Sequence, residues 1–422
     1  MGMDRYEKIT SFDALYAGLK KARRNVMWKD STSGYSYDGL KNTVKLQDAL
    51  RSGEYEIMPY QRFMIHEPKE REIVATRIRD RQFQRSLCDE ALYREMTRGF
   101  IHDNCACQRG KGVDFALDRL EVHLRRYYRE HGKDGWVLRC DIRKYFPQTR
   151  HDTAKAAIRK RVKDEWPRRM AEQIVDSFGG DRGIGLGSQV SQLIELAVLD
   201  DMDHHIKERL RIKHYIRYMD DFILIHQDRE TMERALAEIR RRVEALGLEL
   251  NAKTQIAPMK QGIIFLKWRF TVTETGKVIR KMDGRSVTKE RRKLKKLAGQ
   301  IQRGRIPEEY MWMSFQSWRA NAERGNTHYQ IARMTKLYKE LQGRIRTKGE
   351  EEHETGKERG ADLQGGPAGG SGGGEVREDG GAAGNAAGGR SGGRRHAGAH
   401  RRPGGSHHGA GRDYRRGGVK HD

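Results

Sequence analysis

The sequence predicts an α+β fold followed by an all-helical region and a disordered C-terminal tail. Apolar segments typical of strands alternate with helical patterns over most of the chain, and from about Thr288 the apolar residues recur only at helical spacing. Beyond residue 346 the chain holds 24 of its 47 glycines, and so it cannot bury enough apolar surface to offset its ordering entropy. We therefore expect a helical N-terminal extension (1–50), a region of mixed helices and strands (51–275), a helical region (276–345) and a disordered Gly/Arg-rich tail (346–422).

The individual elements follow from residue periodicity and from capping residues. Glu54–His66 and Val137–Ile142 are expected to be strands, and Tyr215–His226 is expected to form two strands joined by a polar turn. Asp228 is a suitable N-cap for a helix that ends at Gly247, a residue type common at helix C-termini. Apolar residues spaced by three or four define the helical stripes: Met232, Leu236, Ile239, Val243 and Leu246, then Leu294, Leu297 and Ile301, then Ile331, Met334, Tyr338 and Leu341.

The charge balance indicates a polyanionic partner. The 422 residues include 84 Lys and Arg against 59 Asp and Glu, a formal net charge of +25, which favours nucleic acid or anionic lipid as the partner. The tail contributes 14 basic and 11 acidic residues, so a charge of +22 belongs to residues 1–345. No apolar run approaches the roughly 20 residues of a membrane span, and the first residues do not read as a secretory signal. The four cysteines lack zinc-type spacing. We therefore expect a cytoplasmic protein without a membrane partner.

Adjacent carboxylates in an apolar hairpin are the most informative feature. Asp220 and Asp221 repel each other and raise each other's pKa unless a positive group neutralises them, and oxygen ligands suit Mg²⁺ or Mn²⁺. The alternative is an exposed turn, which Asp tolerates well, and the pair alone does not decide between the two. Asp141 ends another predicted strand, where strand-end capping is the simpler reading of a lone aspartate. Together, three carboxylates would hold two metals about 3.5–4 Å apart, as in-line nucleotidyl transfer requires.

Three further segments have the residue types that a nucleotide-handling site needs. The small residues of Gly183–Gln192 allow close approach of a nucleotide. Leu250–Thr254 follows a Gly-terminated helix and places Lys253 where it would protonate pyrophosphate. Ile264–Phe270 alternates apolar and basic residues, as expected of a strand that grips a nucleic-acid backbone. Each segment alone is common, but their order and spacing together favour a polymerase.

These motifs resemble those of prokaryotic reverse transcriptases of the retron and group II intron type, over about residues 50 to 345. Tyr218–Asp221 matches the Y-x-D-D motif, and Asp141–Phe146 matches the first catalytic motif. Leu250–Thr254 matches the L-N-x-x-K-T motif, and Phe265-Leu266 matches the start of the primer grip. The family's fingers motifs are resembled by three segments upstream: Pro68–Ile73, Arg79–Gln84 and Arg109–Gly112. The resemblance implies a right-hand polymerase, with fingers and palm in 51–275 and a helical thumb in 276–345.

The resemblance also implies an activity and a role for each residue of the site. The protein would be an RNA-directed DNA polymerase that adds dNTPs to a DNA or RNA primer on an RNA template, with a basic accessory protein as a further partner. The implied site comprises Asp141, Asp220 and Asp221 as ligands of Mg²⁺ or Mn²⁺, Lys253 as general acid, Lys69 and Arg71 on the triphosphate, Phe146 as the gate against ribonucleotides, and Phe265 and Leu266 as the primer grip.

One departure from the wider family indicates a subfamily. The usual Q-G-x-x-x-S-P loop is here an L-G-x-x-x-S-Q loop that starts at Leu186. This form resembles the loop of reverse transcriptases of diversity-generating retroelements, which miscopy adenines. The resemblance implies that Leu186, Gly187 and Gln189 contact the substrate. Leucine offers only shape where glutamine would hydrogen-bond, so we hypothesise that Leu186 lowers fidelity.

Two alternatives stay open at this point. A retron-like or phage-defence reverse transcriptase would keep the same motifs, and a non-catalytic RNA-binding scaffold would keep the same fold. Between Arg285 and Arg305 the chain has nine basic residues and one acid, Glu290. This asymmetry predicts contacts between the helical region and phosphates, and therefore a steep dependence of binding on salt.

Overall fold

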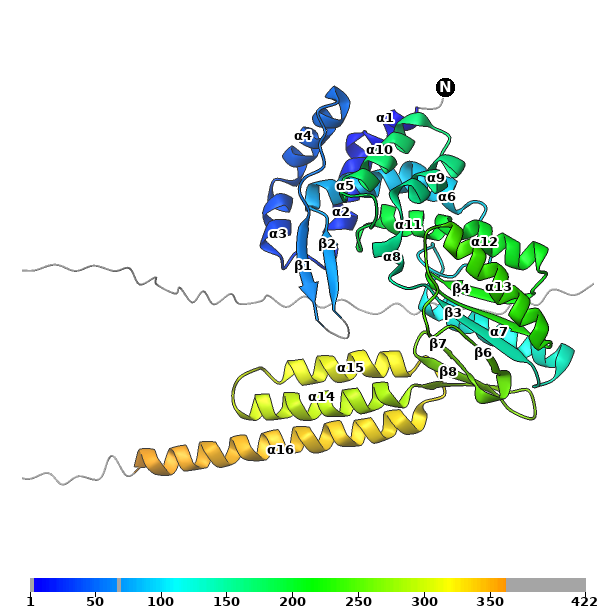
Figure 1. Ribbon diagram of the computed structural model, residues 1–422. Helices are drawn as coiled ribbons and strands as arrows, with labels where there is room; N and C mark the ends of the chain where they lie inside the picture. The colour runs from blue at the N-terminus through cyan, green and yellow to red at the C-terminus, as the bar shows by residue number, and fades with distance from the viewer. Residues whose placement is uncertain (1–3, 67–69, 362–422) are drawn as a thin grey trace, which may run out of the picture. The chain divides into compact units, whose positions relative to one another are not determined.

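The computed structural model of the protein describes residues 4–66 and 70–361, without the side chains of residues 346 and 348–361 (Figure 1). The described residues up to Glu358 form one compact unit. Residues 362–422, which include most of the predicted tail, lie outside the described residues, and so does Lys69.

The N-terminal region is helical, as predicted. It consists of α1 (Arg5–Ile9), α2 (Phe12–Ala22), α3 (Asp30–Tyr37) and α4 (Gly39–Ser52). The Ser11 hydroxyl caps α2 by accepting a hydrogen bond from the backbone of Ala14 at 3.2 Å. Helix α2 packs closely on α5 (Ile78–Leu87), because a Cβ atom on Gly18 would lie only 2.5 Å from the carbonyl oxygen of Gln82. The N-terminal helices therefore share a core with the region that follows.

Two short strands form an antiparallel hairpin after these helices. Strand β1 (Gln61–Ile65) pairs with β2 (Arg71–Ala75). The prediction of a strand over Glu54–His66 is wrong for its first half. There the polar groups bond to the buried carboxyl group of Asp80 and not to a neighbouring strand: the Tyr55 hydroxyl donates to it at 3.0 Å and the Met58 backbone at 2.9 Å.

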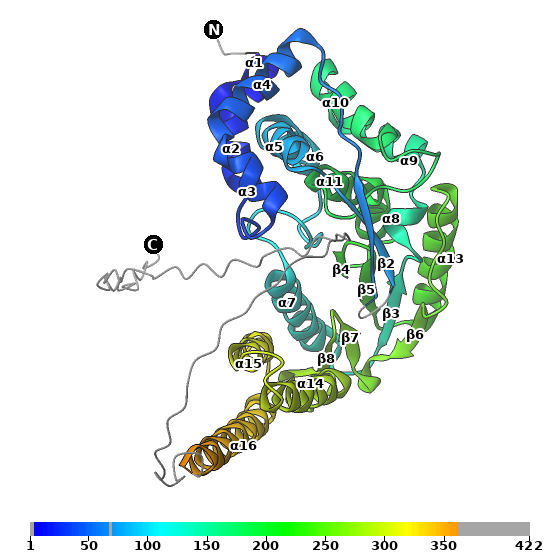
Figure 2. The same ribbon diagram turned by 90° about the vertical axis from the view of Figure 1, so that its left-hand side faces the viewer.

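A four-stranded antiparallel sheet forms the centre of the compact unit. Its order is β4-β5-β3-β6, made of β4 (His214–Tyr218), β5 (Asp221–His226), β3 (Trp136–Asp141) and β6 (Gln255–Pro258). Side chains alternate between its faces. Val137 and Ile223 share a hydrophobic cluster with α7 (Val113–His131), whereas Leu138 and Leu224 share one with α13 (Arg229–Ala245). The two helices consequently lie on opposite faces of the sheet (Figure 2). The predicted strands and the β4–β5 hairpin are confirmed.

The capping residues behave as the sequence predicts, and the remaining helices pack around the sheet. Asp228 accepts a hydrogen bond from the backbone of Thr231 at 2.7 Å and so caps α13, and Gly247 adopts a φ of +73° just beyond its end. The other helices here are α6 (Tyr93–Thr97), α8 (Tyr145–Gln148), α9 (His151–Arg161), α10 (Glu165–Asp176), α11 (Gln189–Val198) and α12 (Asp200–His204), with π-helical turns at Cys88–Leu92 and His205–Arg209 and a 3₁₀ turn at Met259–Gln261.

A second, three-stranded sheet joins this region to the C-terminal helices. It contains β7 (Ile263–Phe265), β8 (Trp268–Val272) and β9 (Val278–Met282) in that order. The single strand predicted over Ile264–Phe270 is therefore a hairpin. Leu266 and Lys267 form its turn with φ values of +49° and +70°, the left-handed pair that a tight hairpin requires. The domain boundary predicted at residue 275 falls inside this sheet.

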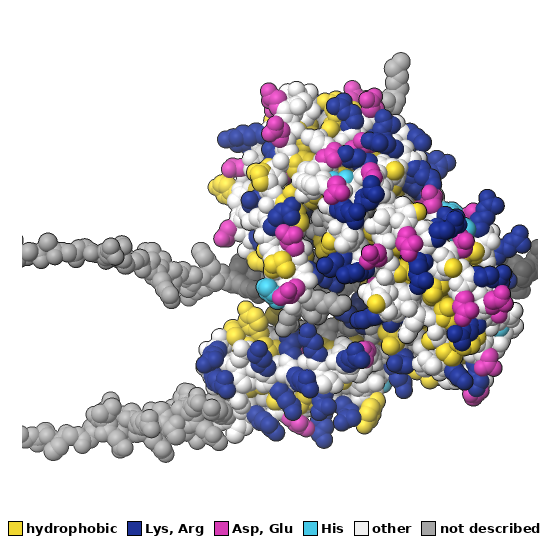
Figure 3. Space-filling view, viewed as in Figure 1, with side chains coloured by type: hydrophobic (Ala, Val, Ile, Leu, Met, Phe, Trp, Pro, Cys, Tyr) yellow, Lys and Arg dark blue, Asp and Glu magenta, His cyan; other side chains and the backbone are white. Residues whose placement is uncertain are grey.

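Three helices form the C-terminal part of the described chain: α14 (Gly284–Gln302), α15 (Glu309–Ala322) and α16 (His328–Ala361). Their predicted apolar stripes pack together, with Leu294, Met334, Tyr338 and Leu341 buried. Helix α16 continues to Ala361, so residues 346–361, which we placed in the tail, are helical. Lys and Arg side chains spread over the surface of these helices (Figure 3). Among the described residues, no helix is both long and apolar enough to cross a membrane.

Candidate active site

Two strands of the central sheet end at the candidate active site. Asp141 is the last residue of β3, Asp221 is the first of β5, and the two are direct cross-strand partners. Directly opposed residues of an antiparallel pair lie on the same face, so the two carboxyl groups are neighbours. Asp220 occupies the preceding turn, where its carbonyl accepts a hydrogen bond from the backbone of Ile142 at 3.3 Å. The fold thus places the three aspartates that the sequence indicates as metal ligands at the adjoining ends of β3 and β5.

At Asp220 and Asp221, burial and the neighbouring carboxylates outweigh the nearby arginines, so the pKa of each is raised. Burial raises the pKa of Asp220, and the charge of Asp141 raises it further, although the guanidinium of Arg71 opposes the rise. Burial also raises the pKa of Asp221 to about 7; the guanidinium of Arg139 opposes this rise, and the charges of Asp141 and Asp220 add to it. A cation beside these groups would stabilise their ionised forms.

The donor set fits a divalent cation. The Oδ1 atom of Asp221 is buried and, within the described residues, has no hydrogen-bond partner. An orphaned buried carboxylate oxygen is costly unless something binds it, and carboxylate oxygens are the ligands that Mg²⁺ and Mn²⁺ prefer. Over residues 4–66 and 70–361, no three or more His, Cys, Asp or Glu side chains are grouped so that they could hold a metal ion, so the three aspartates do not form a ready-made three-ligand site.

The predicted L-N-x-x-K-T segment lies directly beside Asp141. Leu250 bridges to Ile142, and the side-chain amide of Asn251 donates to Oδ2 of Asp141 at 2.9 Å. The backbone of Asn251 also donates to the Asp141 carbonyl at 2.7 Å. Lys253 is exposed, and its backbone N–H donates to the Asn251 side chain at 3.1 Å. Asn251 therefore orients Asp141, a role that we did not assign from the sequence.

A buried ion pair supports the turn that carries Asp220. The Arg217 guanidinium donates to both carboxylate oxygens of Asp203, at 2.7 and 2.6 Å, and both side chains are completely buried. The same guanidinium donates to the carbonyl of Met219 at 3.0 Å and to that of Leu196 at 3.1 Å. Met219 has a φ of +56°, which is strained for a residue with a side chain. Arg217 therefore anchors a strained turn to helices α11 and α12.

A second buried acid lies beneath the site, on α11. The Glu195 side chain is fully buried and accepts a hydrogen bond from the Thr149 hydroxyl at 3.0 Å, while the hydroxyl of Tyr145 donates to the Glu195 backbone carbonyl at 2.6 Å. Burial raises the pKa of Glu195 to about 8, and the charge of Asp220 contributes to the rise. Phe146, which follows Tyr145 and is the residue predicted to exclude ribonucleotides, is partly buried and packs on the core.

The raised pKa of Glu195 predicts a loss of stability with rising pH. Between about pH 4.5 and pH 8 the native state keeps a proton that the unfolded chain has released, so the free energy of unfolding falls as pH rises, by at most about 1.4 kcal/mol per pH unit from this group. We expect Glu195→Gln to flatten this dependence in urea denaturation of the metal-free protein. Glu244→Gln, at an exposed residue of α13, is the matched control. An E195Q slope equal to the wild-type slope would contradict the assignment.

The end of the glycine loop and the start of α11 contact helix α5. The Gln189 side chain accepts a hydrogen bond from Arg85 on α5 at 2.6 Å, and the Ser188 hydroxyl donates to Gln84 at 2.8 Å. Gly187 is exposed with a φ of +108°, a conformation that favours glycine. Leu186 precedes it and is half-buried. Gln189 is therefore occupied by a protein contact, whereas Gly187 lies open.

Of the remaining predicted substrate contacts, three lie near the aspartates, and Lys69 lies outside the described residues. Arg71 begins β2, and its charge acts on Asp220. The backbone of Leu266 lies close enough to Asp221 to lower its pKa, while Phe265 is fully buried in the adjoining core. Lys69 lies outside the described residues, so its role as a triphosphate ligand stays a prediction.

Three supporting residues, Asp203, Arg217 and Glu195, escaped the sequence analysis. Their partners lie far away in the chain, and no local spacing indicates them. The one available signal was the charge itself: Arg217 and Glu195 each interrupt an apolar stretch of the sequence. Buried charges of this kind need partners, and the fold supplies them.

Comparison with known proteins identifies the class of this fold. Residues 68–270 match the family model of the reverse transcriptase (RNA-dependent DNA polymerase). Protein YkfC of Escherichia coli (strain K12) is 26% identical, across 53% of this chain and 70% of its own. Two solved structures are similar at 12% identity: telomerase from Candida albicans in complex with a TWJ fragment of telomeric RNA (TM-score 0.39, 54% of this chain, 46% of that chain) and apo telomerase from Candida tropicalis truncated from its C-terminal domain (TM-score 0.40, 58% and 60%). This chain spans about half the length of those telomerase chains.

The chain therefore carries a reverse transcriptase domain, the domain of RNA-directed DNA polymerases. The predicted α+β polymerase fold and the predicted enzyme class are confirmed. Reverse transcriptases use divalent metals, RNA templates and nucleotides. We accordingly refer to β1–β2 and α5 as the fingers, to the four-stranded sheet and its helices as the palm, and to α14–α16 as the thumb.

Proposed function

We propose that this protein adds dNTPs to a DNA or RNA primer on an RNA template by a two-metal mechanism, as the error-prone reverse transcriptase of a diversity-generating retroelement. The observation that carries the catalytic part is the register that places Asp141 opposite Asp221, with Asp220 in the adjoining turn. The buried, unpartnered oxygen of Asp221 supports a cation at this position.

In this proposal Asp141, Asp220 and Asp221 hold Mg²⁺ or Mn²⁺. Bound metal would lower the pKa of the attacking 3′-hydroxyl and stabilise the leaving pyrophosphate. Asn251 orients the Asp141 carboxylate through its 2.9 Å hydrogen bond. The exposed ammonium of Lys253 protonates the pyrophosphate.

Substrate positioning falls to residues around the aspartates. Arg71, together with Lys69, binds the triphosphate through charge-assisted hydrogen bonds. The ring of Phe146 occupies the space beside the sugar 2′ position and so disfavours ribonucleotides. The Leu266 turn, whose backbone contacts Asp221, places the primer end against the aspartates. The basic residues of α14 hold the duplex phosphates.

Primer extension on poly(rA)/oligo(dT) with Mg²⁺ tests this proposal. We expect incorporation of dTTP that depends on the added metal, because three neighbouring carboxylates cannot stabilise the developing charge alone. Binding of the template–primer without any incorporation would favour the alternative of a non-catalytic RNA-binding scaffold.

The loop residue Leu186 provides a test of the subfamily. If leucine reads only the shape of the nascent pair, Leu186→Gln should lower misincorporation opposite template adenines by about 10-fold, since a well-placed hydrogen bond discriminates by roughly 1–2 kcal/mol. Sequencing of the cDNA made on a defined RNA template measures this change. Leu186→Met, which keeps an apolar side chain of similar size, is the control and should retain the wild-type error spectrum. An unchanged spectrum in L186Q would remove the basis for the fidelity hypothesis.

A retron-like or phage-defence reverse transcriptase is the alternative to this subfamily. A pair of repeats that differ at adenines in the DNA flanking the gene would favour the retroelement, and a structured non-coding RNA gene in their place would favour the alternative. The basic accessory protein implied by the resemblance stays a prediction, to be tested by co-purification of the full chain with products of the neighbouring genes.

A further inference from the structure

Two buried histidines of the palm lie beside the strand that leads into the catalytic turn. His123 of α7 is 4% exposed, His214 at the start of β4 is 7% exposed, and their Nδ1 atoms lie 3.4 Å apart. We propose that this pair is a pH-sensitive latch on β4: the neutral pair holds the strand against α7, and a proton taken up at acid pH releases it. The latch belongs to the fold, and only its effect on incorporation rests on the proposed polymerase function.

The hydrogen bonds of the pair determine where its protons lie. Nε2 of His123 lies 3.0 Å from Oδ1 of Asp103, so this nitrogen donates to the carboxylate. Nδ1 of the neutral His123 ring is then an acceptor, and Nδ1 of His214 is the donor across the 3.4 Å contact. Nε2 of His214 keeps a lone pair that is buried and, within the described residues, has no hydrogen-bond partner. An added proton therefore goes to Nε2 of His214.

The surroundings of this nitrogen oppose a proton. Burial lowers the pKa of His214 to about 4, and the neighbouring His123 lowers it further. The carboxylate of Glu130 acts in the opposite sense, but its Oε2 lies 3.8 Å from Nε2 of His214, beyond the reach of a hydrogen bond. The groups that face His214 come from three places: His123, Tyr127, Glu130 and His131 of α7, Lys207 of the second π-helical turn, and the preceding Lys213.

The carboxylate of Asp103 is already neutralised. Its Oδ2 accepts a hydrogen bond from Lys207 at 2.7 Å, its Oδ1 accepts from Arg119 as well as from His123, and His102 lies 3.9 Å away. Although burial acts against them, the donors hold the pKa of Asp103 well below its usual range. Burial lowers the pKa of His123 despite its bond to Asp103. A proton added to the pair would consequently place an uncompensated charge in the palm core, which the closed structure disfavours.

Strand β4 connects the pair to the active site. It is the edge strand of the four-stranded sheet, and its outer side pairs with a short loop at Asn104. There the backbone of Arg217 donates to the Asp103 carbonyl at 3.0 Å, and the backbone of Cys105 donates to the Arg217 carbonyl at 2.9 Å. Asn104 is completely buried, yet among the described residues neither polar atom of its side chain has a partner, which weakens this contact. The loop that Asp103 anchors therefore reaches Arg217, three residues before Asp220.

The strand is held on both of its faces. Side chains alternate along a strand, so His214 faces α7, whereas Arg217 bonds to Asp203 on the opposite face. Release of the histidine pair would leave the Arg217 side alone to support the turn at Met219, whose φ of +56° is strained. The position of Asp220 in that turn would then no longer be fixed.

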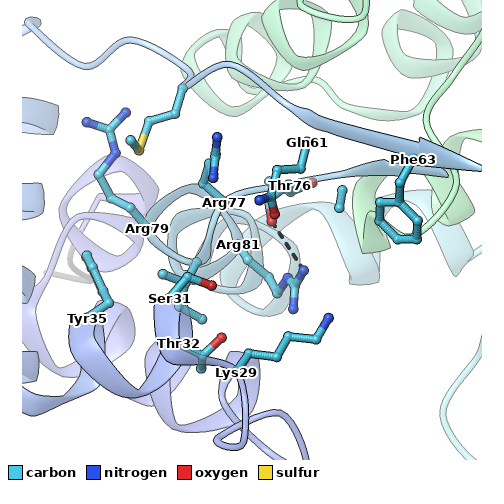
Figure 4. A pocket seen from close by; sticks show the side chains of 13 residues that line it. Lys29, Ser31, Thr32, Tyr35, Gln61, Phe63, Thr76, Arg77, Arg79 and Arg81 are labelled. Atoms are coloured by element: carbon cyan, nitrogen blue, oxygen red, sulfur yellow. Dashed lines mark hydrogen bonds between the residues drawn. The ribbon is translucent and has the colours of Figure 1, made fainter. Parts of the chain in front are cut away.

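The largest basic cavity of the fingers would not produce the same pH effect. It has a volume of about 400 Å³ and lies between α3, strand β1 and the chain from the end of β2 into α5 (Figure 4). Its described lining residues include no His, Asp or Glu, and its four cations are Lys29, Arg77, Arg79 and Arg81. Lysine and arginine side chains keep their charge between pH 5 and pH 8. The charge of this cavity is therefore constant over the range in which the latch acts.

Hydrogen exchange of backbone amides measures the opening of the latch. The amides of Cys105 and Arg217 report it, and the amides of α13, on the opposite face of the sheet, are the internal reference. His214→Asn keeps a donor toward His123 but cannot take up a proton. With a pKa of about 4 in the closed state and about 6.5 in the open state, the opening constant of the wild type relative to this variant should rise about 10-fold from pH 7.5 to pH 5.5.

Single-turnover incorporation reports the same latch at the active site. The rate of the wild type relative to His214→Asn should fall severalfold over this pH range, and the ratio cancels the titration of the aspartates. His328→Gln, at an exposed position of α16, is the matched control and should keep the pH dependence of the wild type in both measurements. Thermal melting at pH 7.5 checks that the variants fold, and His214→Gln replaces His214→Asn if that variant does not.

The two measurements separate the latch from the proposed function. Exchange is measured without metal, primer or dNTP, so it decides the inference even in a protein that does not polymerise DNA. An equal pH dependence of exchange in the wild type and in H214N would overturn the inference, whatever the activity. In an active protein, opening without any change in relative incorporation would overturn it too, because the latch would then not act on the catalytic turn.

Discussion

Asp221→Asn should abolish dNTP incorporation, lowering kcat by at least about 10³-fold. The change removes one of the three carboxylates proposed to hold the metals, and loss of about 4 kcal/mol of transition-state stabilisation corresponds to this factor. Asp220→Ala should have an effect of similar size. Both variants are measured by primer extension on poly(rA)/oligo(dT) in saturating Mg²⁺.

The structure supplies a control and a second readout for this prediction. Asp181→Asn changes an exposed aspartate whose side chain is 89% accessible, and it should leave incorporation unchanged. Because burial and the neighbouring carboxylates raise the pKa of Asp221, replacing it by a neutral amide should also stabilise the metal-free protein at pH 8. Incorporation by D220A equal to that of the wild type would contradict the proposed catalytic site, whatever the measured stability of the variants.

We expect Arg217→Met to lower the free energy of unfolding by about 3–5 kcal/mol. We also expect it to lower kcat. The substitution leaves the carboxylate of Asp203 completely buried without its charge partner, which is among the most costly changes in a protein core. It also removes the donor that holds the Met219 carbonyl, next to Asp220. Urea denaturation measures the first effect, and single-turnover incorporation measures the second.

A double variant separates stability from positioning. Arg217→Met/Asp203→Leu removes both charges, so it should recover much of the lost stability, because a buried ion pair is often replaceable by apolar side chains. Its kcat should stay low with a smaller change in the KM for dNTP, because the strained Met219 turn still lacks its anchor. Arg229→Met, from an exposed pair with Glu233, should cost less than about 1 kcal/mol. Full recovery of kcat in the double variant would show that Arg217 acts on stability alone.

The parts of the fold that local chemistry specifies were predictable. Alternation of apolar residues gave β3, β4 and β5, and Asp228 and Gly247 marked the ends of α13. The errors arose where a distant residue competes for the backbone. Asp80 takes the hydrogen bonds of the segment before β1, and a left-handed turn at Leu266 divides what looked like one strand. Helix α16 likewise continues past a change in composition that does not interrupt its backbone.

The sequence by itself determined the chemical groups of this protein: the paired aspartates in a hairpin, a third aspartate at a strand end, and the basic surplus of the folded part. Only the tertiary structure decided that Asp141 lies opposite Asp221, that Arg217 and Asp203 support the turn between the strands, and that α3 closes a basic cavity against the fingers. The physical reason is the range of the interactions. Alternation, turns and caps depend on residues a few positions apart, whereas register, buried charge pairs and cavities depend on the packing of segments far apart in the chain, which no local pattern encodes.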